Sequence, residues 1–335
     1  MYAKIKGFVI ALLLVLATSF SAYCEITIKH AGFRTLYLMP LFVAIDRGIF
    51  KAHGLDVNYQ ELESGALTPA VLLSGGADIV NDDLLGVAPL AEQGKDLFMV
   101  YNLLDRMTMD MIVRNDVLAR VGYDATLSPK DRAKFLKGLT IGVTRAGAPT
   151  DIYARYLMTE GGLHPQRDAN MVQIGGIGAL RAAFRSGRID AFMLSPPLPQ
   201  QLERDGVGTI IIRGTAGDIP ALTKMSFITV FTTQRYANAN KPTLRAYVRS
   251  LQEAMTWIRA NHDEALKELQ QNWFKDTPLE TLRTSYDALL PAMSETGAFT
   301  QEGLEKFVHV YRTVGERTNI DLREGRFWTN AYTRD

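Results

Sequence analysis

The sequence predicts an α/β fold with two similar Rossmann-like lobes. Strand patterns alternate with helix patterns along most of the 335-residue chain, which indicates parallel sheets with crossover helices. A helix, then Ser-Gly-x-x-Asp, then an apolar strand occurs at residues 74–80 and again at residues 186–192. Each copy alone is a common connection between a helix and a strand, but the same order of elements twice indicates two lobes of one architecture.

The first lobe begins with a strand at residues 25–29, where polar and apolar residues alternate. A helix is expected over about residues 38–50, and Gly54 follows its end. The pattern then predicts a strand at 56–60, a helix at 67–73, and strands at 78–80 and 97–101.

Two segments are expected to connect the lobes. The apolar stretch at residues 109–114 is interpreted as a strand leaving the first lobe, and residues 224–231 as a strand returning to it. Two such crossings form a hinge. The predicted organisation is a signal peptide at 1–24, lobe 1 at 25–114 plus 230–335, and lobe 2 at 115–229. The helical stripes after Pro242 are expected to be core.

The first 24 residues have the order of a secretory signal. Lys4 and Lys6 precede an apolar run at residues 7–17, which is too short to span a bilayer. A buried N-terminal helix is disfavoured because the run has no amphipathic stripe. Cys24 is either the last residue removed or a lipid-bearing first residue, and the bulky Tyr23 favours simple cleavage. We therefore expect a periplasmic protein.

The composition and motifs argue against several function classes. The net charge of +1 provides no basis for a nucleic-acid partner. None of the five histidines has a metal-ligand spacing, no nucleophile elbow is present, and residues 175–178 lack the features of a P-loop. We expect no catalytic residue, metal or cofactor, although His30, at the end of the first strand, could face a cleft.

Candidate binding residues lie where the expected strands end, because ligands of open α/β sheets bind beyond the carboxyl ends of strands. A polar turn follows one strand at Asn81, and Ser195 opens the corresponding turn in the second copy. The pocket is predicted to be lined by Phe33, Tyr37, Asp82, Asp83, Gly147, Ala148, Ser195 and Phe227.

Each group has an expected role. Asp82 or Asp83 would accept hydrogen bonds, the backbone of residues 147–150 would donate them, and the aromatic rings would stack on the ligand. Two plainer interpretations stay open. The turn at 147–150 is also typical of a strand-to-helix connection capped by Thr150 or Asp151. Phe33 and Tyr37 would equally cap the end of the sheet.

The order of several short motifs resembles a known family. Residues 40–44, 48–50 and 54–57 look like the opening of the nitrate/sulfonate/taurine and thiamine-precursor family of periplasmic binding proteins. Residues 74–79, 139–143, 161–163 and 187–197 continue the likeness in order. The resemblance covers roughly residues 26–232 and implies the type II periplasmic-binding-protein fold, an ABC importer permease as partner, and a monomer that binds a small molecule.

One departure from this family bears on the ligand. Sulfonate- and taurine-type members usually carry small or hydroxyl residues where this chain has Asp82 and Asp83, and two carboxylates repel an anion. An N–H-bearing ligand, such as an aminopyrimidine, fits better than a sulfonate, although Arg106 or Arg145 could neutralise an acid. The alternatives are an enzyme on the same two-lobed fold and a ligand-sensing subunit.

Overall fold

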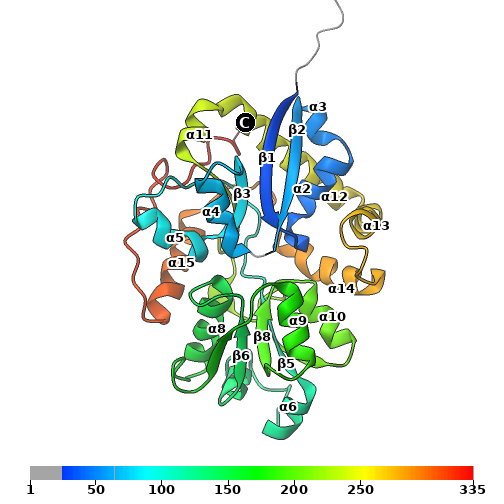
Figure 1. Cartoon of the computed structure of the whole chain (residues 1–335), viewed down its shortest axis with the longest axis vertical. Helices are drawn as coiled ribbons and strands as arrows, with labels where there is room; N and C mark the ends of the chain where they lie inside the picture. The colour runs from blue at the N-terminus through cyan, green and yellow to red at the C-terminus, as the bar shows by residue number, and fades with distance from the viewer. Residues whose placement is uncertain (1–24, 64, 335) are drawn as a thin grey trace, which may run out of the picture.

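The computed structural model describes residues 25–63 and 65–334. They form two α/β lobes, each built on a five-stranded sheet (Figure 1). The strand order is β2-β1-β3-β10-β4 in lobe 1 and β7-β6-β8-β5-β9 in lobe 2. This arrangement confirms the predicted fold class. The predicted signal peptide and Cys24 lie outside the described residues.

Lobe 1 combines the start and the end of the chain. Its strands are β1 (Ile26–Phe33), β2 (Leu55–Leu62), β3 (Ile79–Asp83), β4 (Phe98–Asn102) and β10 (Ile228–Thr232). Its early helices are α2 (Met39–Asp46), α3 (Ile49–Ala52), α4 (Thr68–Leu73) and α5 (Leu84–Glu92). The later ones are α11 (Gln234–Ala239), α12 (Lys241–Ala260), α13 (His262–Asn272), α14 (Leu279–Leu289) and α15 (Gln301–Thr313).

Lobe 2 is continuous in sequence. Its strands are β5 (Asp110–Arg114), β6 (Thr140–Val143), β7 (Asn170–Gln173), β8 (Ala191–Leu194) and β9 (Gly208–Arg213). Its helices are α6 (Asn115–Val121), α7 (Pro129–Arg132), α8 (Pro149–Glu160), α9 (Ile177–Arg185) and α10 (Leu198–Arg204).

Several predicted elements have different bounds in the structure. The helix expected at 38–50 is two helices, because Gly48 adopts a left-handed conformation, with φ 68°, between α2 and α3. The polar residues 81–83 are not a turn but the last three residues of β3. They stay extended because β3 pairs with β10, with Asp82 opposite Thr229.

The lobe boundary also differs from the sequence-based one. Residues 110–114, assigned to lobe 1 from the sequence, form β5, which pairs with β8 and β9 of the second sheet. The first crossing is therefore the segment between β4 and β5. The returning strand begins at Ile228 rather than at Lys224, so the second crossing extends from β9 to β10.

The repeated Ser-Gly-x-x-Asp motif has the same role in both lobes. Gly75 and Gly187 end α4 and α9 in the left-handed conformation, with φ 77° and 76°. Asp78 Oδ2 then accepts from Lys29 N in β1, and Asp190 Oδ2 accepts from Thr140 N at the start of β6, both at 2.9 Å. Each aspartate therefore ties the motif to the neighbouring strand.

C-terminal helices of lobe 1 pack against lobe 2. In Figure 1, α14 lies next to α10, and α15 lies next to α8. Arg204 Nη1 donates to Thr281 Oγ1 at 3.1 Å across the first contact, and the Tyr156 hydroxyl lies 3.4 Å from His309 Nε2 across the second. The two lobes of this structure therefore contact each other at two places, through α14 with α10 and through α15 with α8.

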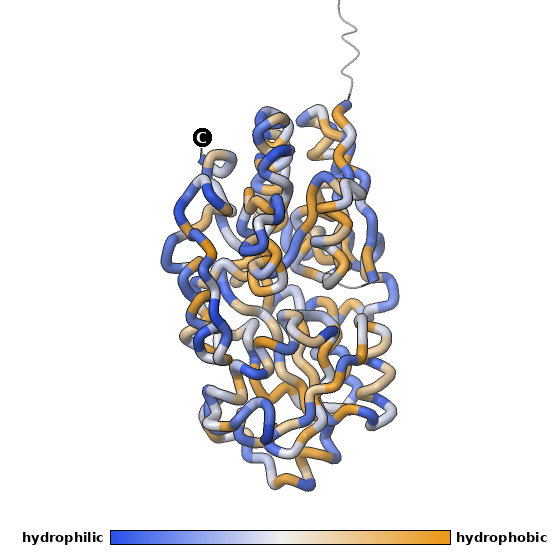
Figure 2. The backbone as a smooth tube through the Cα atoms, turned by 60° about the vertical axis from the view of Figure 1, so that its left-hand side comes forward, coloured by the Kyte–Doolittle hydropathy of each residue, from blue (hydrophilic) through white to orange (hydrophobic). Residues whose placement is uncertain are grey.

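The hydrophobic pattern of the chain agrees with this packing. Figure 2 shows the apolar segments gathered mainly inside each lobe and polar segments along much of the outside. The α12 stripe predicted as core is buried, and so is the α15 stripe except for the partly buried Val308. Within residues 25–63 and 65–334, no helix combines the length and apolar character needed to cross a membrane.

Candidate functional site

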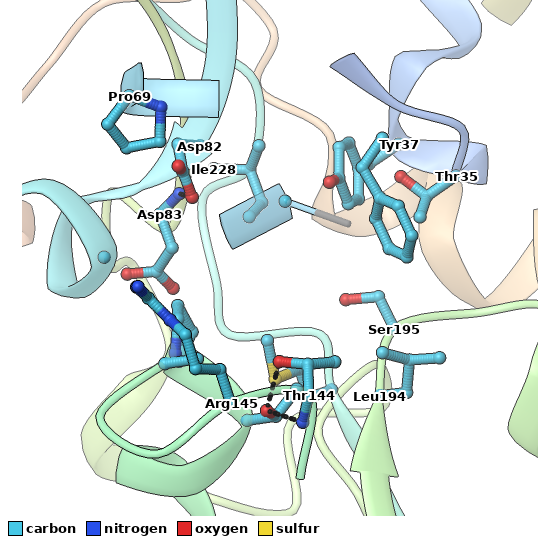
Figure 3. A pocket seen from close by; sticks show the side chains of 17 residues that line it. Thr35, Tyr37, Pro69, Asp82, Asp83, Thr144, Arg145, Leu194, Ser195 and Ile228 are labelled. Carbon is cyan, nitrogen blue, oxygen red and sulfur yellow. Dashed lines mark hydrogen bonds between the residues drawn. The ribbon is translucent and has the colours of Figure 1, made fainter. Parts of the chain in front are cut away.

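A cavity of about 80 Å³ lies between the lobes, where strands of both sheets end. Figure 3 shows Asp82 and Asp83 on one side of it, Thr35 and Tyr37 on another, and Thr144, Arg145 and Ser195 contributed by lobe 2. The full lining consists of Phe33, Thr35, Tyr37, Gly65, Pro69, Asp82, Asp83, Gly86, Met109, Thr144, Arg145, Ala148, Pro149, Thr150, Leu194, Ser195 and Ile228.

Two carboxyl groups form the wall that β3 contributes. Asp82 Oδ1 accepts from Asp83 N at 2.8 Å, and Asp82 Oδ2 accepts from the hydroxyl of Thr68. Asp83 Oδ1 accepts from Leu85 N at 2.6 Å and caps α5. Asp83 Oδ2 is buried without a well-formed hydrogen bond from the described residues. The buried Tyr153 hydroxyl also acts on this carboxyl group as a hydrogen-bond donor, but more weakly than burial does. A buried acceptor without a well-formed hydrogen bond is costly, so this oxygen can accept from a ligand when the carboxyl group is ionised.

Burial determines the charge of these carboxyl groups. Asp82 is partly exposed to the cavity, but the surrounding protein desolvates it and raises its pKa to about 7, although the Thr68 hydroxyl, Asp83 N and Arg145 act in the opposite direction. Burial also raises the pKa of Asp83 well above its ordinary value. Near neutral pH the wall is therefore only partly ionised and is primarily a hydrogen-bonding surface.

The opposite wall comes from the end of β1 and the residues that follow it. Phe33 is the last residue of β1, and Tyr37 lies in the short 3-10 helix, Leu36–Leu38, that follows it. Thr35 Oγ1 is buried and has no hydrogen-bond partner in the described part of the chain. His30 does not line the cavity; it lies behind this wall and contacts Tyr247 and Asn81.

Lobe 2 contributes a third wall at the start of α8. Thr150 Oγ1 accepts from Thr144 N at 3.0 Å and lies 2.9 Å from Thr144 Oγ1, which fixes the turn (Figure 3). Gly147 N donates to Asp151 Oδ2 at 2.9 Å, and Ala148 N donates to Arg145 O at 3.1 Å. The expectation that these amides are free for a ligand is therefore wrong for residues 147 and 148.

The structure brings together six of the eight residues predicted to form one pocket: Phe33, Tyr37, Asp82, Asp83, Ala148 and Ser195. Gly147 is not in the lining. Phe227 is also outside it, because the ring is fully buried in the interlobe core and packs edge-on against Tyr153, with 5.5 Å between ring centroids. Its neighbour Ile228, the first residue of β10, lines the cavity instead.

Other lining residues were not predicted from the sequence. Thr150 belongs to the turn that the sequence analysis considers, where it is expected only as a helix cap, and Thr144 precedes that turn; both line the cavity. Pro69 and Gly86 come from α4 and α5, which flank β3. Their positions depend on helix packing, which leaves no motif in the sequence.

The cavity adjoins a larger outer chamber of about 510 Å³. Phe33, Leu194 and Ser195 line both spaces, so they separate the inner cavity from the outer chamber. Charged side chains of both signs line the chamber, together with Trp273 and Phe274 near the end of α13. Across the described residues, no group of three or more histidine, cysteine or acidic side chains is placed to hold a metal ion.

The raised pKa of Asp82 predicts a pH-dependent stability. Between about pH 4 and 7 the folded state holds a proton on Asp82 that the unfolded state has lost, so this group makes the protein less stable as pH rises. In Asp82→Asn this contribution disappears. The free energy of unfolding of the variant, relative to wild type, should therefore rise by about 2–4 kcal/mol over this range.

Urea unfolding at several pH values measures this difference. His30, whose pKa burial lowers to about 4, has the opposite effect between pH 4 and 6.5, but it is present in both proteins and cancels. Parallel pH profiles for the two proteins would show that Asp82 is ionised in the folded state throughout.

Comparisons with known proteins agree with this geometry. A model of the NMT1-like family matches residues 28–271. The putative binding protein YtlA of Bacillus subtilis (strain 168) is 24% identical over 259 residues, covering 76% of this chain and 72% of YtlA. The nitrate/nitrite binding protein NrtA of Synechococcus elongatus is 24% identical over 261 residues, which are 73% of this chain but only 58% of NrtA.

Among solved structures, the alkanesulfonate-binding protein SsuA of Xanthomonas axonopodis pv. citri superposes with a TM-score of 0.70 at 16% identity. This match covers 86% of this chain and 93% of SsuA, and it shows a shared fold. The family match extends over well more than half of the chain. This protein therefore belongs to the NMT1-like family and has the two-lobed α/β fold of the periplasmic binding proteins.

Proposed function

We propose that this protein is the exported solute-binding component of an ABC importer and that it holds a small N–H-bearing molecule, such as an aminopyrimidine, between its lobes. In this proposal the protein is a monomer that binds its ligand without chemical change, and the permease recognises the closed, ligand-bound form. The observation that carries the proposal is the pair of adjacent carboxyl groups of Asp82 and Asp83 in the wall of the interlobe cavity, where Asp83 Oδ2 has no well-formed hydrogen bond from a described residue.

The charges of the lining argue against a small oxyanion. NrtA is named for nitrate and nitrite and SsuA for alkanesulfonates, but here two carboxyl groups face one arginine, Arg145, in the cavity. Both aspartates have raised pKa values because they are buried. An anion placed beside them would raise these values further, whereas an N–H donor stabilises the ionised form.

The size of the space is consistent with a small ligand. An engineered protein cavity of about 150 Å³ holds one benzene ring, and the inner cavity here is about 80 Å³. A ring-sized ligand therefore needs a small separation of the lobes, or it extends past Phe33 and Ser195 toward the outer chamber. The two crossings provide the hinge for such a movement.

A thermal-shift screen tests the proposal directly. Pyrimidines, amino acids, sulfonates and aromatic acids are added separately, and a compound that binds only the folded state raises the apparent melting temperature. We expect the largest shift from an aminopyrimidine and none from nitrate or simple sulfonates. Recovery of the bound compound in chemically altered form would instead indicate an enzyme. Unchanged uptake after deletion of the gene would indicate a sensing role.

Asp82→Ala should weaken binding of the strongest compound in this screen more than Asp82→Asn does. Asparagine keeps an acceptor oxygen beside the cavity, whereas alanine removes it and leaves Asp83 N without its side-chain acceptor. Isothermal titration calorimetry should show a loss of about tenfold or more for alanine.

Asp110→Asn is the matched control for these variants. Asp110 is another buried aspartate whose pKa burial raises to about 7, but it lies outside the cavity lining and accepts from Thr215. Its replacement should leave affinity unchanged. Equal, negligible effects of both Asp82 variants would remove Asp82 from the binding site.

Gly176→Ala should weaken binding by hindering closure of the lobes. A Cβ atom at Gly176, in lobe 2, would lie 2.5 Å from the carbonyl oxygen of Glu63, in lobe 1. The clash exists only when the lobes are together, and its relief by separation should reduce affinity about tenfold. Gly178→Ala, two residues further on and within α9, places a Cβ atom that meets nothing within 4 Å and should bind as wild type does.

Small-angle X-ray scattering checks the cause of this effect. With ligand present, Gly176→Ala should have a larger radius of gyration than Gly178→Ala. Identical radii and identical affinities for the two variants would contradict the closed arrangement of the lobes as the binding state.

A further inference from the structure

A chain of buried polar side chains leads from α12 to the cavity wall at Tyr37. His30 Nδ1 lies 2.7 Å from the Tyr247 hydroxyl, and His30 Nε2 lies 3.3 Å from Asn81 Oδ1. Asn81 Nδ2 in turn donates to the Tyr37 hydroxyl at 3.4 Å. All four side chains are at most 6% exposed, and only Tyr37 lines the cavity.

His30 is neutral in this chain. Its ring is desolvated by burial, which lowers its pKa to about 4, and its two hydrogen-bond partners are an uncharged tyrosine and an uncharged amide. A neutral imidazole has one donor nitrogen and one acceptor nitrogen. The direction of every hydrogen bond in the chain therefore depends on which nitrogen of His30 carries the proton.

Tyr247 determines that tautomer. Within the part of the chain that the structure describes, His30 Nδ1 is the hydrogen-bond partner of the Tyr247 hydroxyl, and Tyr247 is fully buried. If Nδ1 carried the proton, the hydroxyl would accept and its own proton would be buried without an acceptor, which is costly. Tyr247 therefore donates to Nδ1, and the His30 proton is on Nε2.

The remaining directions follow from this one. Nε2–H donates to Asn81 Oδ1, so the amide group of Asn81 directs its Nδ2 toward Tyr37. Gly32 allows this placement, because a Cβ atom there would lie 2.3 Å from Asn81 Oδ1. The oxygen of Tyr37 accepts from Asn81, so the proton of this hydroxyl is available either to the neighbouring Thr35 hydroxyl or to a ligand acceptor in the cavity that both residues line.

We propose that Tyr247, His30 and Asn81 form a relay that makes Tyr37 a hydrogen-bond donor to the ligand. The relay gives the two walls opposite polarity: Tyr37 donates, while Asp82 and Asp83 accept in the ionised form, which an N–H donor favours. The ligand then presents an acceptor, such as a ring nitrogen or a carbonyl oxygen, toward Tyr37 and an N–H group toward the aspartates. Tyr247, His30 and Asn81 are positioning residues. This inference rests on the proposed function.

The direction of the relay is tested without any ligand. Two-bond ¹H–¹⁵N correlation spectra of the wild-type protein, labelled with ¹⁵N-histidine, report which ring nitrogen is protonated at neutral pH. We expect a neutral His30 with its proton on Nε2, assigned by comparison with His30→Gln. A proton on Nδ1, or on both nitrogens, would overturn the relay and leave the transport proposal intact.

The consequence for the ligand is tested with two probes. 4-Aminopyrimidine carries an amino group and ring nitrogens, whereas aniline carries the same amino group with C–H groups in place of those nitrogens. Calorimetry should show that the wild type prefers 4-aminopyrimidine by about threefold to tenfold. Tyr37→Phe should remove the preference, and Tyr247→Phe should reduce it, because nothing then fixes the tautomer of His30.

Tyr59→Phe is the control for these variants. The Tyr59 hydroxyl donates to the Gly32 carbonyl oxygen at 3.0 Å, and its ring lies 6.0 Å from that of His30, but it takes no part in the relay. This variant should keep the wild-type preference. Equal affinities for the two probes, absence of binding by both, or the same loss in Tyr59→Phe as in Tyr37→Phe would overturn the proposed ligand polarity.

Discussion

The burial of two carboxyl groups where the lobes meet is the constraint on which the site depends. Desolvation raises the pKa values of Asp82 and Asp83, and one oxygen of Asp83 has no well-formed hydrogen bond from the described residues. When the lobes separate, water can solvate these groups. When the lobes close without a ligand, the carboxyl groups lose this solvation. A guest that supplies N–H groups restores it, so such a guest stabilises the closed form more than the open one. That difference is what links binding to closure.

The architecture places these carboxyl groups at the meeting point in a simple way. Each sheet contains one antiparallel strand that follows or precedes a crossing, β10 in lobe 1 and β5 in lobe 2. Asp82 is opposite Thr229 of β10, directly after the returning crossing. The aspartates therefore sit on the strand beside the hinge, where a small rotation changes the distance to lobe 2 without disturbing the cores.

Much of this arrangement was predictable from the sequence, and the failures have identifiable causes. The repeated Ser-Gly-x-x-Asp motif predicts two lobes because the same residues end a helix and begin a strand in both copies, and the aspartate of each copy accepts from the backbone of the neighbouring strand. The aspartates were placed at a strand end because they follow an apolar strand. Phe227 was placed wrongly, because it precedes β10 and packs against Tyr153 of lobe 2, a tertiary contact that the sequence does not reveal. The free amides expected at residues 147 and 148 are occupied by Asp151 and Arg145, which the spacing alone does not reveal.

The role of His30 shows a further limit of sequence reasoning. Its position at the end of an expected strand suggested that it could face the cleft, but its partners come from 51 and 217 positions away in the chain. Only tertiary packing of α12 against α2 and α3 brings Tyr247 to it. A helix whose apolar stripe indicates only core therefore carries the hydroxyl that, in the proposed relay, acts on the ligand through His30, Asn81 and Tyr37. The walls of the cavity consequently differ in polarity for separate reasons: burial on the aspartate side, and a hydrogen-bond direction set by α12 on the tyrosine side.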